Sequence, residues 1–578
     1  MKPVEETLLL WVDADFADIF EVRGVQRARR GERVPVVAGP DALAFGYRGL
    51  DGVERRTRVR CEPPARIADG HLALDVRLAP RESLHFLVKI RWEMLPPGFE
   101  HPPDRGGAAG WTAARLETAS LPWRDWIQRS TADLAMMVTQ TEHGPYPYAG
   151  VPWFSAPFGR DGLIAAFECL WLDPELARGV LSFLAATQAT VSDPERDAEP
   201  GKILHETRKG ELAALGEVPF GCYYGSVDAT PLFVALAGAY FERTQDRAFA
   251  EMLWPHLEAA LARIDADSDE RGFLSYRRRS SRGLAQQGWK DSGDSVFHAD
   301  GTLAEPPIAL CEVQAYVHLA RCGAARIARA LARAERADAL EDEAARLARR
   351  FEAAFWCEEL GTYALALDGQ GAPCRVRTSN AGHCLYGRIA APERARRVAR
   401  TLFAERMHSG WGVRTLASDE RRYNPMSYHN GSVWPHDNAL IAQGLAHYGL
   451  GDEALALLEA GFDASRRVDL HRMPELICGF ARRPDQAPVA YPLACTLQAW
   501  AAGAVFLLLQ AALGLSISAA RREVRLVRPS LPRTLGELHI RELRVADGTV
   551  DIELVRRGED IVVNATPRSG RVQVLVER

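Results

Sequence analysis

Seven segments of the sequence stand out because most of them combine an aromatic or small residue with a fixed polar group between Gly and Pro residues. They span residues 152–162, 202–208, 221–228, 288–294, 411–415, 428–436 and 472–475. Loops that a rigid scaffold holds are where binding and catalytic residues concentrate. Pyranose rings stack their apolar faces on Trp and Tyr, and their hydroxyls bind Asp, Glu, Arg and His. Together the segments favour a carbohydrate site.

Candidate sugar-binding side chains are the aromatic and polar residues of these segments. They are Trp153, Phe154, Arg160, Asp161, Glu206, Arg208, Tyr224, Asp228, Trp289, Lys290, Tyr428, His429, Trp434 and His436.

Any one segment alone also fits a purely structural role. Arg160 and Asp161 could form a local ion pair, and Asp161 or Asp228 could cap a following helix, because Asp is a favoured N-cap residue. Trp434 with the following proline could be a packing corner, and the two histidines of the 428–436 segment could be structural. The composition that the seven segments share favours the functional interpretation.

The elements that would position these residues differ along the chain. Residues 5–95 contain short runs that alternate apolar and polar residues, at 56–61, 71–77 and 84–91, which is typical of antiparallel sheet. A Pro/Gly-rich stretch at 96–110 predicts a domain boundary. Alternation returns at 516–578, with Asp547-Gly548 and Ser569-Gly570 as hairpin turn signals. We therefore expect β structure at both ends.

Between about 112 and 515 the apolar residues recur near i, i+3 and i+4, which predicts helices. The clearest segments are 232–243, 248–264, 310–334, 338–356, 390–405, 437–449, 452–462 and 495–513. Because no 34-residue or similar repeat runs through them, a solenoid is disfavoured and the helices are expected to close on themselves.

Composition excludes several classes. The 578 residues are 25% charged and 47% hydrophobic with a formal net charge of -5, which implies neither a nucleic-acid nor a membrane partner. The N-terminus lacks signal-peptide features, and the ten cysteines show no zinc-like spacing. We expect a reduced, cytoplasmic protein with no metal. No P-loop, dinucleotide fingerprint or EF-hand pattern occurs, so no cofactor is expected.

Several of these motifs are similar to those of one family. The run Val12-Asp-Ala-Asp-Phe-Ala-Asp-Ile-Phe-Glu-Val-Arg-Gly24, the loop Trp289-Lys-Asp291, and the downstream Pro474-Glu-Leu476 and Gln498-Ala-Trp500 resemble the bacterial amylo-α-1,6-glucosidase or glycogen-debranching family. The resemblance covers nearly the whole chain. Typical relatives carry a longer N-terminal domain, and this sequence resembles the second half of that β-sandwich.

The resemblance implies a mainly α protein with a glucoamylase-like (α/α)6-barrel catalytic domain at 111–515. An N-terminal β-sandwich-like domain with linker would occupy 1–110, and a C-terminal β segment 516–578. Asp291 would be the general acid and Glu475 the general base, with Arg160, Asp161 and Trp434 in the terminal-sugar pocket and Gln498 as a further sugar-binding residue.

Two carboxyls suit glycosidic cleavage, because a proton must reach the leaving oxygen while water is activated on the opposite ring face. One carboxyl must be protonated while the other is ionised. Trp289 beside Asp291 favours the protonated form, and Arg472 is expected to keep Glu475 ionised. Asp294 is a rival for the acid role.

The expected reaction is inverting, exo-acting hydrolysis of an α-linked glucosyl residue of an α-glucan or oligosaccharide. Cleavage of another small α-glycoside, phosphorolysis on the same barrel, and a non-catalytic carbohydrate-binding protein stay open as alternatives. The sequence leaves open the linkage and the oligomeric state.

Overall fold

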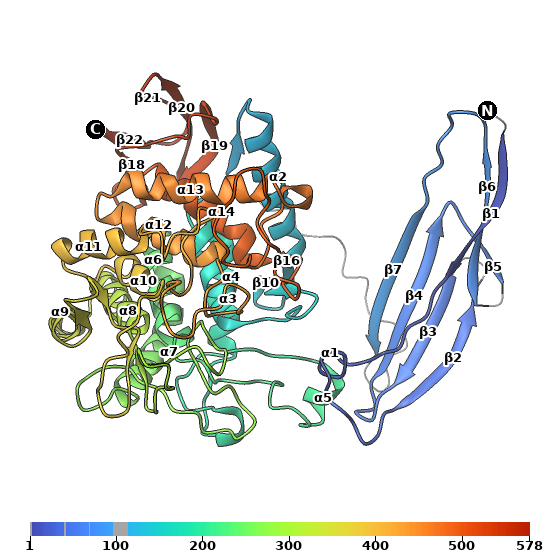
Figure 1. The fold of residues 1–578 in the computed structure, drawn as a ribbon, viewed down its shortest axis with the longest axis horizontal. Coiled ribbons are helices and arrows are strands. Elements are labelled where there is room, and N and C mark those ends of the chain that lie inside the picture. The colour runs from blue at the N-terminus through green and yellow to red at the C-terminus, as the bar shows by residue number, and fades with distance from the viewer. Residues whose placement is uncertain (1–2, 40–41, 69, 96–113) are drawn as a thin grey trace. The chain divides into compact units, whose positions relative to one another are not determined.

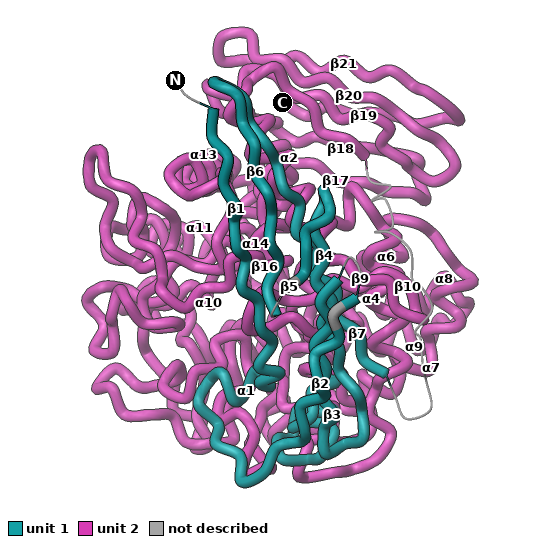
Figure 2. Tube along the Cα trace, turned by 90° about the vertical axis from the view of Figure 1, so that its right-hand side faces the viewer, with its two compact units in different colours: residues 1–107, 208–221 teal, residues 108–207, 222–578 magenta. Residues whose placement is uncertain are grey.

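A computed structural model describes residues 3–39, 42–68, 70–95 and 114–578. The chain divides into two compact units (Figure 2). Unit 1 comprises residues 1–107 together with 208–221, and unit 2 comprises 108–207 together with 222–578. The predicted boundary at 96–110 lies outside the described residues.

Unit 1 is built of antiparallel β-sheet, as its alternating sequence predicts. One sheet has the order β1(Val4–Trp11), β6(His71–Leu78), β5(Arg66–Ala68). The other has the order β2(Glu32–Ala38), β3(Ala42–Arg48), β4(Glu54–Glu62), β7(Leu87–Leu95). Buried Leu43 and Val59 of the larger sheet and Leu72 and Leu74 of the smaller one belong to one apolar core. Burying that shared core holds the two sheets of this unit together.

The 208–221 segment joins unit 1 through a buried carboxylate. It contains α5(Glu211–Ala214), and the Glu211 side chain accepts hydrogen bonds from Tyr47 Oη at 2.8 Å and from the Leu50 amide at 2.7 Å. Arg27 approaches the same carboxylate at 3.2 Å. In the same unit, α1(Ile19–Val22) begins with a capping box. The Asp18 side chain accepts a hydrogen bond from the backbone amide of Glu21, and the Glu21 side chain accepts one from the backbone amide of Asp18.

Six helices of unit 2 contact one another in a closed cycle, and Figure 1 labels each of them. Each member contacts the next and the last contacts the first, in the order α3(Gly159–Cys169), α6(Ala229–Thr244), α8(Cys311–Ala330), α10(Asn380–Tyr386), α12(Pro435–His447), α14(Ala499–Ala512). We call these the inner helices. Nearly every residue of α3, α12 and α14 is buried, which fits helices enclosed on all sides.

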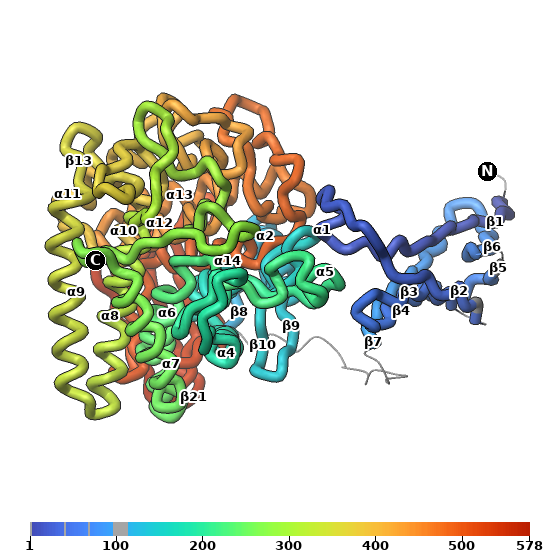
Figure 3. The backbone as a smooth tube through the Cα atoms, turned by 90° about the horizontal axis from the view of Figure 1, so that it is seen from below, coloured from blue at the N-terminus to red at the C-terminus, as the bar shows by residue number. Residues whose placement is uncertain are grey.

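A second layer of helices packs on the inner ones. Each inner helix contacts at least one outer helix. Taken in cyclic order, the pairs are α3 with α4(Pro174–Ala186), α6 with α7(Arg247–Ala266), α8 with α9(Ala334–Ala354), α10 with α11(Pro392–Leu402), α12 with α13(Gly451–Ser465), and α14 with α2(Leu121–Met137). Figure 3 shows α8 and α9 side by side. Helix α9 buries only one stripe, from Ala337 to Phe351, and exposes the rest, as expected for an outer amphipathic helix.

Two glycines allow the closest approach of inner helices. A Cβ at Gly238 of α6 would lie 2.4 Å from the Cα of Gly323 in α8. Any side chain at either position would push these two helices apart.

The C-terminal alternation forms strands, as predicted. One sheet has the order β21(Asp560–Ser569), β20(Gly548–Arg557), β19(Glu537–Val545), β8(Arg115–Glu117), and the other β17(Leu515–Ser518), β18(Glu523–Val527), β22(Gln573–Glu577). Short pairs in the loops are β9(Val138–Thr141) with β10(Gly144–Pro147), β11(Gly150–Val151) with β16(Leu497–Gln498), β12(Ala309–Leu310) with β15(Ala366–Leu367), and β13(Trp356–Cys357) with β14(Thr362–Tyr363).

Every helical segment named from the sequence is a helix, but α1, α2, α3, α4, α5 and α10 lie outside the segments that were named. Over the whole chain the structure is mixed, with 35% helix and 25% strand, so "mainly α" describes unit 2 better than the protein. All ten cysteines are free, as expected. None of the helices in the described ranges is long and apolar enough to cross a membrane.

Candidate active site

The candidate residues gather where inner helices begin. Asp161 lies in the first turn of α3, Asp228 is the N-cap residue of α6, Trp434 that of α12, and Gln498 that of α14. The backbone amides of a helix's first turn have no partner within the helix, so these ends favour acceptors and negative charge.

Three candidates lie in different elements from those expected. The sequence placed Arg160, Asp161 and His436 in loops, and this is wrong, because α3 begins at Gly159 and α12 at Pro435. Neither Asp161 nor Asp228 makes a side-chain capping bond to its helix. Their carboxylates are therefore available for other contacts.

Arg160 connects two carboxylates. Its Nη1 donates to Asp228 Oδ2 at 3.1 Å and to the Gly288 carbonyl at 2.8 Å, and its Nη2 donates to Asp291 Oδ2 at 2.8 Å. Ser226 Oγ donates to Asp228 Oδ1 at 2.6 Å. The side chains of Arg160 and Asp228 are 3% and 0% exposed, whereas that of Asp291 is 28% exposed. Asp291 is therefore the solvent-accessible end of an otherwise buried set of ion pairs that joins Asp228, Arg160 and Asp291.

The environment of Asp291 favours its protonated form. Burial raises the pKa of Asp291, the positive charge of Arg160 opposes that rise, and the negative charge of Asp228 adds to it. The net pKa of Asp291 is raised because burial, with the added charge of Asp228, outweighs the effect of Arg160. Asp294, its rival for the acid role, has an exposed side chain, and its carbonyl accepts from Asn430 Nδ2.

Glu475 is held through both carboxylate oxygens. Its Oε1 accepts from Tyr428 Oη at 2.5 Å, and its Oε2 accepts from the Cys495 amide at 2.6 Å. Burial raises the pKa of Glu475, these two hydrogen bonds oppose the rise, and the charge of Asp291 adds to it. The side chain is almost fully buried. Its orientation is therefore fixed by two donors, one of which is main chain.

Arg472 does not support Glu475 in the way that the sequence suggested. Its Nε donates to Asp133 Oδ2 at 2.7 Å and its Nη2 to Asp133 Oδ1 at 3.0 Å. Asp133 belongs to α2 and is buried, so it needs a cation of its own. The expectation that Arg472 keeps Glu475 ionised is wrong.

A third carboxyl, Asp161, belongs to the same electrostatic environment. Burial raises the pKa of Asp161 to about 7, Arg160 opposes this, and the charges of Asp291 and Glu475 add to it. Gln498 Nε2 donates to Asp161 Oδ1 at 3.2 Å. Asp161, Asp291 and Glu475, which come from three distant parts of the sequence, are therefore close enough to influence one another's protonation.

Aromatic residues of the candidate segments pack behind these carboxyls. Trp289 stacks on His383 and meets His429, Trp434 and His436 edge-on. His436 stacks on Trp500 with ring centroids 3.7 Å apart.

These rings are buried, and burial lowers the pKa of both His429 and His436 well below the usual range, so both are neutral. Trp434 is almost fully buried and donates to the Tyr428 carbonyl at 3.0 Å, as a packing corner would.

Several buried polar atoms near the carboxyls have no protein partner within the described part of the chain. They are both ring nitrogens of His436, Oε1 of Gln498 and Nε1 of Trp289. Such atoms lose their bonds to water without compensation, so they are suited to hydroxyl groups of a bound molecule.

The other candidates make contacts elsewhere. Trp153 Nε1 donates to the Leu493 carbonyl at 3.0 Å, Lys290 Nζ to the Thr415 carbonyl at 2.6 Å, and Tyr224 Oη to the Thr187 carbonyl at 2.8 Å. Burial lowers the pKa of Lys290 to about 8. The main chain of Glu206 pairs with Tyr223.

Phe154 packs edge-on against Phe158. Arg208 lies over the Phe20 ring and belongs to unit 1 with the rest of 208–221.

Some neighbours of the site were not singled out from the sequence. Cys495 supplies a main-chain donor to Glu475, and Ser226 binds Asp228. Asp437 accepts from His383 Nε2 at 2.7 Å in a fully buried pair. The only sequence signal that pointed to Asp437 was its position directly after the 428–436 segment. Among the described residues no group of His, Cys, Asp and Glu is suited to a metal ion, and the absence of a cofactor remains an expectation.

Comparison with solved structures shows the class of fold. A GH78 rhamnosidase from a Bacillus species superposes with a TM-score of 0.57 at 14% identity, over 94% of this chain and 55% of that one. A GH63 mannosylglycerate hydrolase from Thermus thermophilus in complex with glucose gives 0.51 at 15%, over 66% of this chain and 99% of that one. An α-L-rhamnosidase from Streptomyces avermitilis complexed with L-rhamnose gives 0.51 at 16%, over 93% and 49%. The fold is that of these glycoside hydrolases, and the chain spans about half the length of both rhamnosidases.

Sequence comparison then gives the family. Residues 158–473, more than half of the chain, match the mannosylglycerate hydrolase MGH1-like glycoside hydrolase domain, and the chain belongs to this family. Residues 1–89 match the N-terminal domain of some glycogen debranching enzymes, which confirms the resemblance found in Val12–Gly24. No curated protein matches the chain in sequence.

Proposed function

We propose that the protein is an exo-acting, inverting glycoside hydrolase that releases glucose from α-linked glucosides, most closely of the amylo-α-1,6-glucosidase type. The observation that carries this proposal is the pair Asp291 and Glu475, each with a raised pKa, and the charge of Asp291 contributes to the rise at Glu475. The family match over 158–473 supports glycoside hydrolysis, and the debranching-type domain at 1–89 supports an α-glucoside substrate.

The proposed scaffold is an (α/α)6 barrel. Its support is the cycle of six inner helices, each backed by one outer helix, together with the likeness to GH63 and GH78 enzymes. On this scaffold residues 1–110 and 516–578 would be the N- and C-terminal β domains that flank a catalytic domain at 111–515.

Asp291 is assigned as the acid and Glu475 as the base. The Asp291 carboxyl gives its proton to the glycosidic oxygen, and the bond between that oxygen and the anomeric carbon breaks. Glu475 takes a proton from a water whose oxygen bonds to the anomeric carbon from the opposite face. Arg160 stabilises the Asp291 carboxylate left behind, and Tyr428 and the Cys495 amide hold Glu475 in orientation.

Two variants and one spectrum test this assignment. Asp291→Asn and Glu475→Gln are each expected to lower kcat by about a thousandfold or more, because general acid and base catalysis each contribute about 10²- to 10⁴-fold. Asp294→Asn, whose carboxyl is exposed, is the matched control and should stay near wild type. Proton NMR of the first-formed sugar should show the β-anomer, and an initial α-anomer would exclude inversion.

A second candidate substrate is the α-mannoside of glycerate. The family match and the likeness to a mannosylglycerate hydrolase favour it. Release of sugar from panose, isomaltose, maltose, limit dextrin and mannosylglycerate, measured side by side, distinguishes the two. Turnover that strictly requires phosphate would indicate phosphorolysis, and binding of maltooligosaccharide without any product would indicate a non-catalytic protein.

A further inference from the structure

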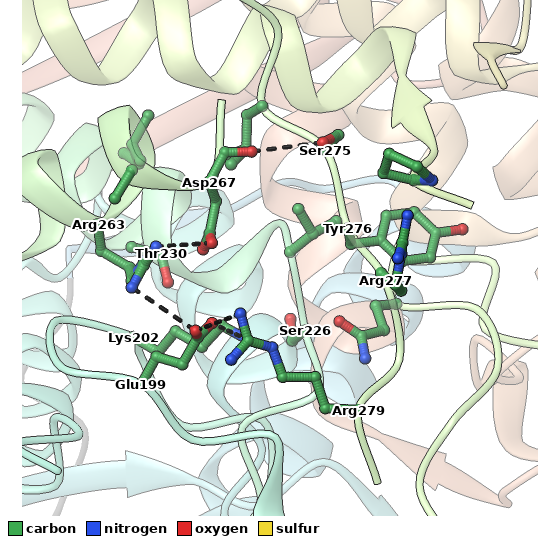
Figure 4. Close-up of a pocket in the computed structure, with 16 residues that line it drawn as sticks. Glu199, Lys202, Ser226, Thr230, Arg263, Asp267, Ser275, Tyr276, Arg277 and Arg279 are labelled. Carbon is green, nitrogen blue, oxygen red and sulfur yellow. Dashed lines mark hydrogen bonds and ion pairs between the residues drawn. The ribbon is translucent and has the colours of Figure 1, made fainter. Parts of the chain in front are cut away.

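A separate cavity of about 310 Å³ lies in unit 2 (Figure 4). Its walls come from the end of α7, the loop after it, the 199–202 segment and the start of α6. Neither Asp291 nor Glu475 lines it. A cavity of this size suits one small molecule.

The lining carries more positive than negative charge. Its cations are Lys202, Arg263, Arg277 and Arg279, and its carboxylates are Glu199 and Asp267.

Glu199 is shared among three of these cations. It lies 2.6 Å from Arg279, 3.4 Å from Lys202 and 3.8 Å from Arg263. Asp267 lies 2.8 Å from Arg263. Because two carboxylates face four cations, the cavity keeps an excess of positive charge.

Arg277 supplies part of this excess. It is exposed, and no partner for its guanidinium occurs among the described residues. In Figure 4 it lies beside Tyr276, on the same loop as Arg279. A planar guanidinium with unused donors is suited to bind an oxyanion through two parallel hydrogen bonds.

A neutral donor also faces the cavity. Gln287 lines it and is 2% exposed, yet its side-chain Nε2 has no partner in the parts of the chain that are described. The Gln287 main chain is fixed, because its carbonyl accepts from the Val227 amide at 2.9 Å. A buried amide nitrogen without an acceptor is costly, so an acceptor atom from outside the chain would stabilise this position.

Thr230 adds a second neutral donor. Its hydroxyl oxygen accepts from the Ile203 amide at 3.1 Å, which leaves the hydroxyl proton available to donate. Arg277, Gln287 and Thr230 therefore each offer a donor, and these donors lie among cations.

We propose that this cavity binds a small oxyanion, a molecule that presents a phosphate or a carboxylate group. Acceptor oxygens would satisfy Gln287 and Arg277 together, and the negative charge would balance the excess of cations. The proposal is independent of the proposed hydrolase activity, since it concerns residues outside the group around Asp291 and is tested without turnover.

Isothermal titration calorimetry on the full chain at low ionic strength tests the proposal, with inorganic phosphate, D-glycerate and glucose 6-phosphate as separate titrants. One saturable site is expected for at least one of them. If the three titrants bind equally tightly, the cavity recognises only the phosphate or carboxylate group. If D-glycerate or glucose 6-phosphate binds more tightly than inorganic phosphate, the ligand is a sugar acid or a sugar phosphate.

Variants locate the site. Arg277→Ala is expected to weaken binding by about tenfold or more, because it removes a charged donor. Arg349→Ala is the matched control, since Arg349 is also exposed and unpaired among the described residues but lies on α9. Gln287→Leu, of similar volume, should weaken binding as well. No saturable heat with any titrant, or equal affinity of Arg277→Ala and Arg349→Ala, would overturn the proposal.

Discussion

Arg160 holds Asp228 and Asp291 at once, at 3.1 Å through Nη1 and 2.8 Å through Nη2. The two carboxylates differ in exposure, since Asp228 is wholly buried and Asp291 reaches solvent. Burial and the charge of Asp228 together outweigh the effect of Arg160 on Asp291, so the pKa of the Asp291 carboxyl is raised although a guanidinium contacts it. The proposed role of Asp291 as the acid requires such a raised pKa.

Removing the charge of Asp228 should strengthen the hold of Arg160 on the Asp291 carboxylate. In Asp228→Asn the pKa of Asp291 falls, because Asp228 is one of the causes that raise it. Since the acid must be protonated, the basic limb of the kcat/KM profile should move to lower pH, by about one unit. The measurement is the pH dependence of sugar release. Ser292→Ala, beside Asp291 but uncharged, should leave the basic limb in place, and an unmoved limb in Asp228→Asn would contradict the assignment.

The Tyr428 hydroxyl should set the acidic limb. Tyr428→Phe removes a hydrogen bond that favours ionised Glu475, so the pKa of Glu475 rises further. Because the base must be ionised, the acidic limb moves to higher pH, by about one to two units for a bond to a charged group worth about 1.5–3 kcal/mol. Tyr423→Phe is the control, because its hydroxyl donates to the Gly479 carbonyl instead. Equal profiles for the two variants would argue against Glu475 as the base.

Helices α6 to α9 and α11 to α14 were predictable because apolar periodicity marks them. Helix α3 was missed because it opens with Gly159, Asp161 and Gly162, whose helix propensity is low. In the structure tertiary packing overrides this low propensity. Local rules fail where function places polar groups in an inner helix.

The site itself was only partly predictable. Trp289, Asp291 and Glu475 follow from short motifs, but their partners are set by contacts between distant segments. Arg472 lies three residues from Glu475 and yet pairs with Asp133, 339 positions away. An extended segment points successive side chains in opposite directions, so closeness in sequence did not imply contact.

Asp161 should make stability depend on pH. The pKa of Asp161 is about 7 in the folded protein and 3.8 as a reference value, so the folded state binds the extra proton between these values. Stability therefore falls as pH rises from about 4 to 7, by an amount on the order of 4 kcal/mol if this residue acted alone.

Asp161→Asn removes this dependence and keeps an acceptor for Gln498. The variant should have a higher Tm than wild type at pH 8 and a similar Tm at pH 4.5, measured by thermal unfolding at both values. Asp294→Asn, at an exposed carboxyl, should show neither effect. A variant that is less stable at pH 8 would show that Asp161 is stabilised in its ionised form.

Glu211 should hold the 208–221 segment within unit 1. Its carboxylate accepts from Tyr47 and from the Leu50 amide and faces Arg27, so Glu211→Ala leaves two donors without their acceptor, while Arg27 keeps its ion pair with Glu217. Leaving a buried donor unsatisfied costs about 1–3 kcal/mol. The Leu50 amide should then exchange its proton much faster, which hydrogen exchange followed by mass spectrometry measures on the peptide that contains it. Tyr47→Phe removes a single hydrogen bond and should accelerate exchange less.

The same contacts should make this stabilisation depend on pH. Burial raises the pKa of Glu211, but its hydrogen-bond partners and Arg27 lower it overall. The stabilisation is therefore present at neutral pH and is lost as the pH falls through the folded-state pKa. The wild-type amide should therefore approach the exchange behaviour of Glu211→Ala in acid, after correction for the intrinsic rate.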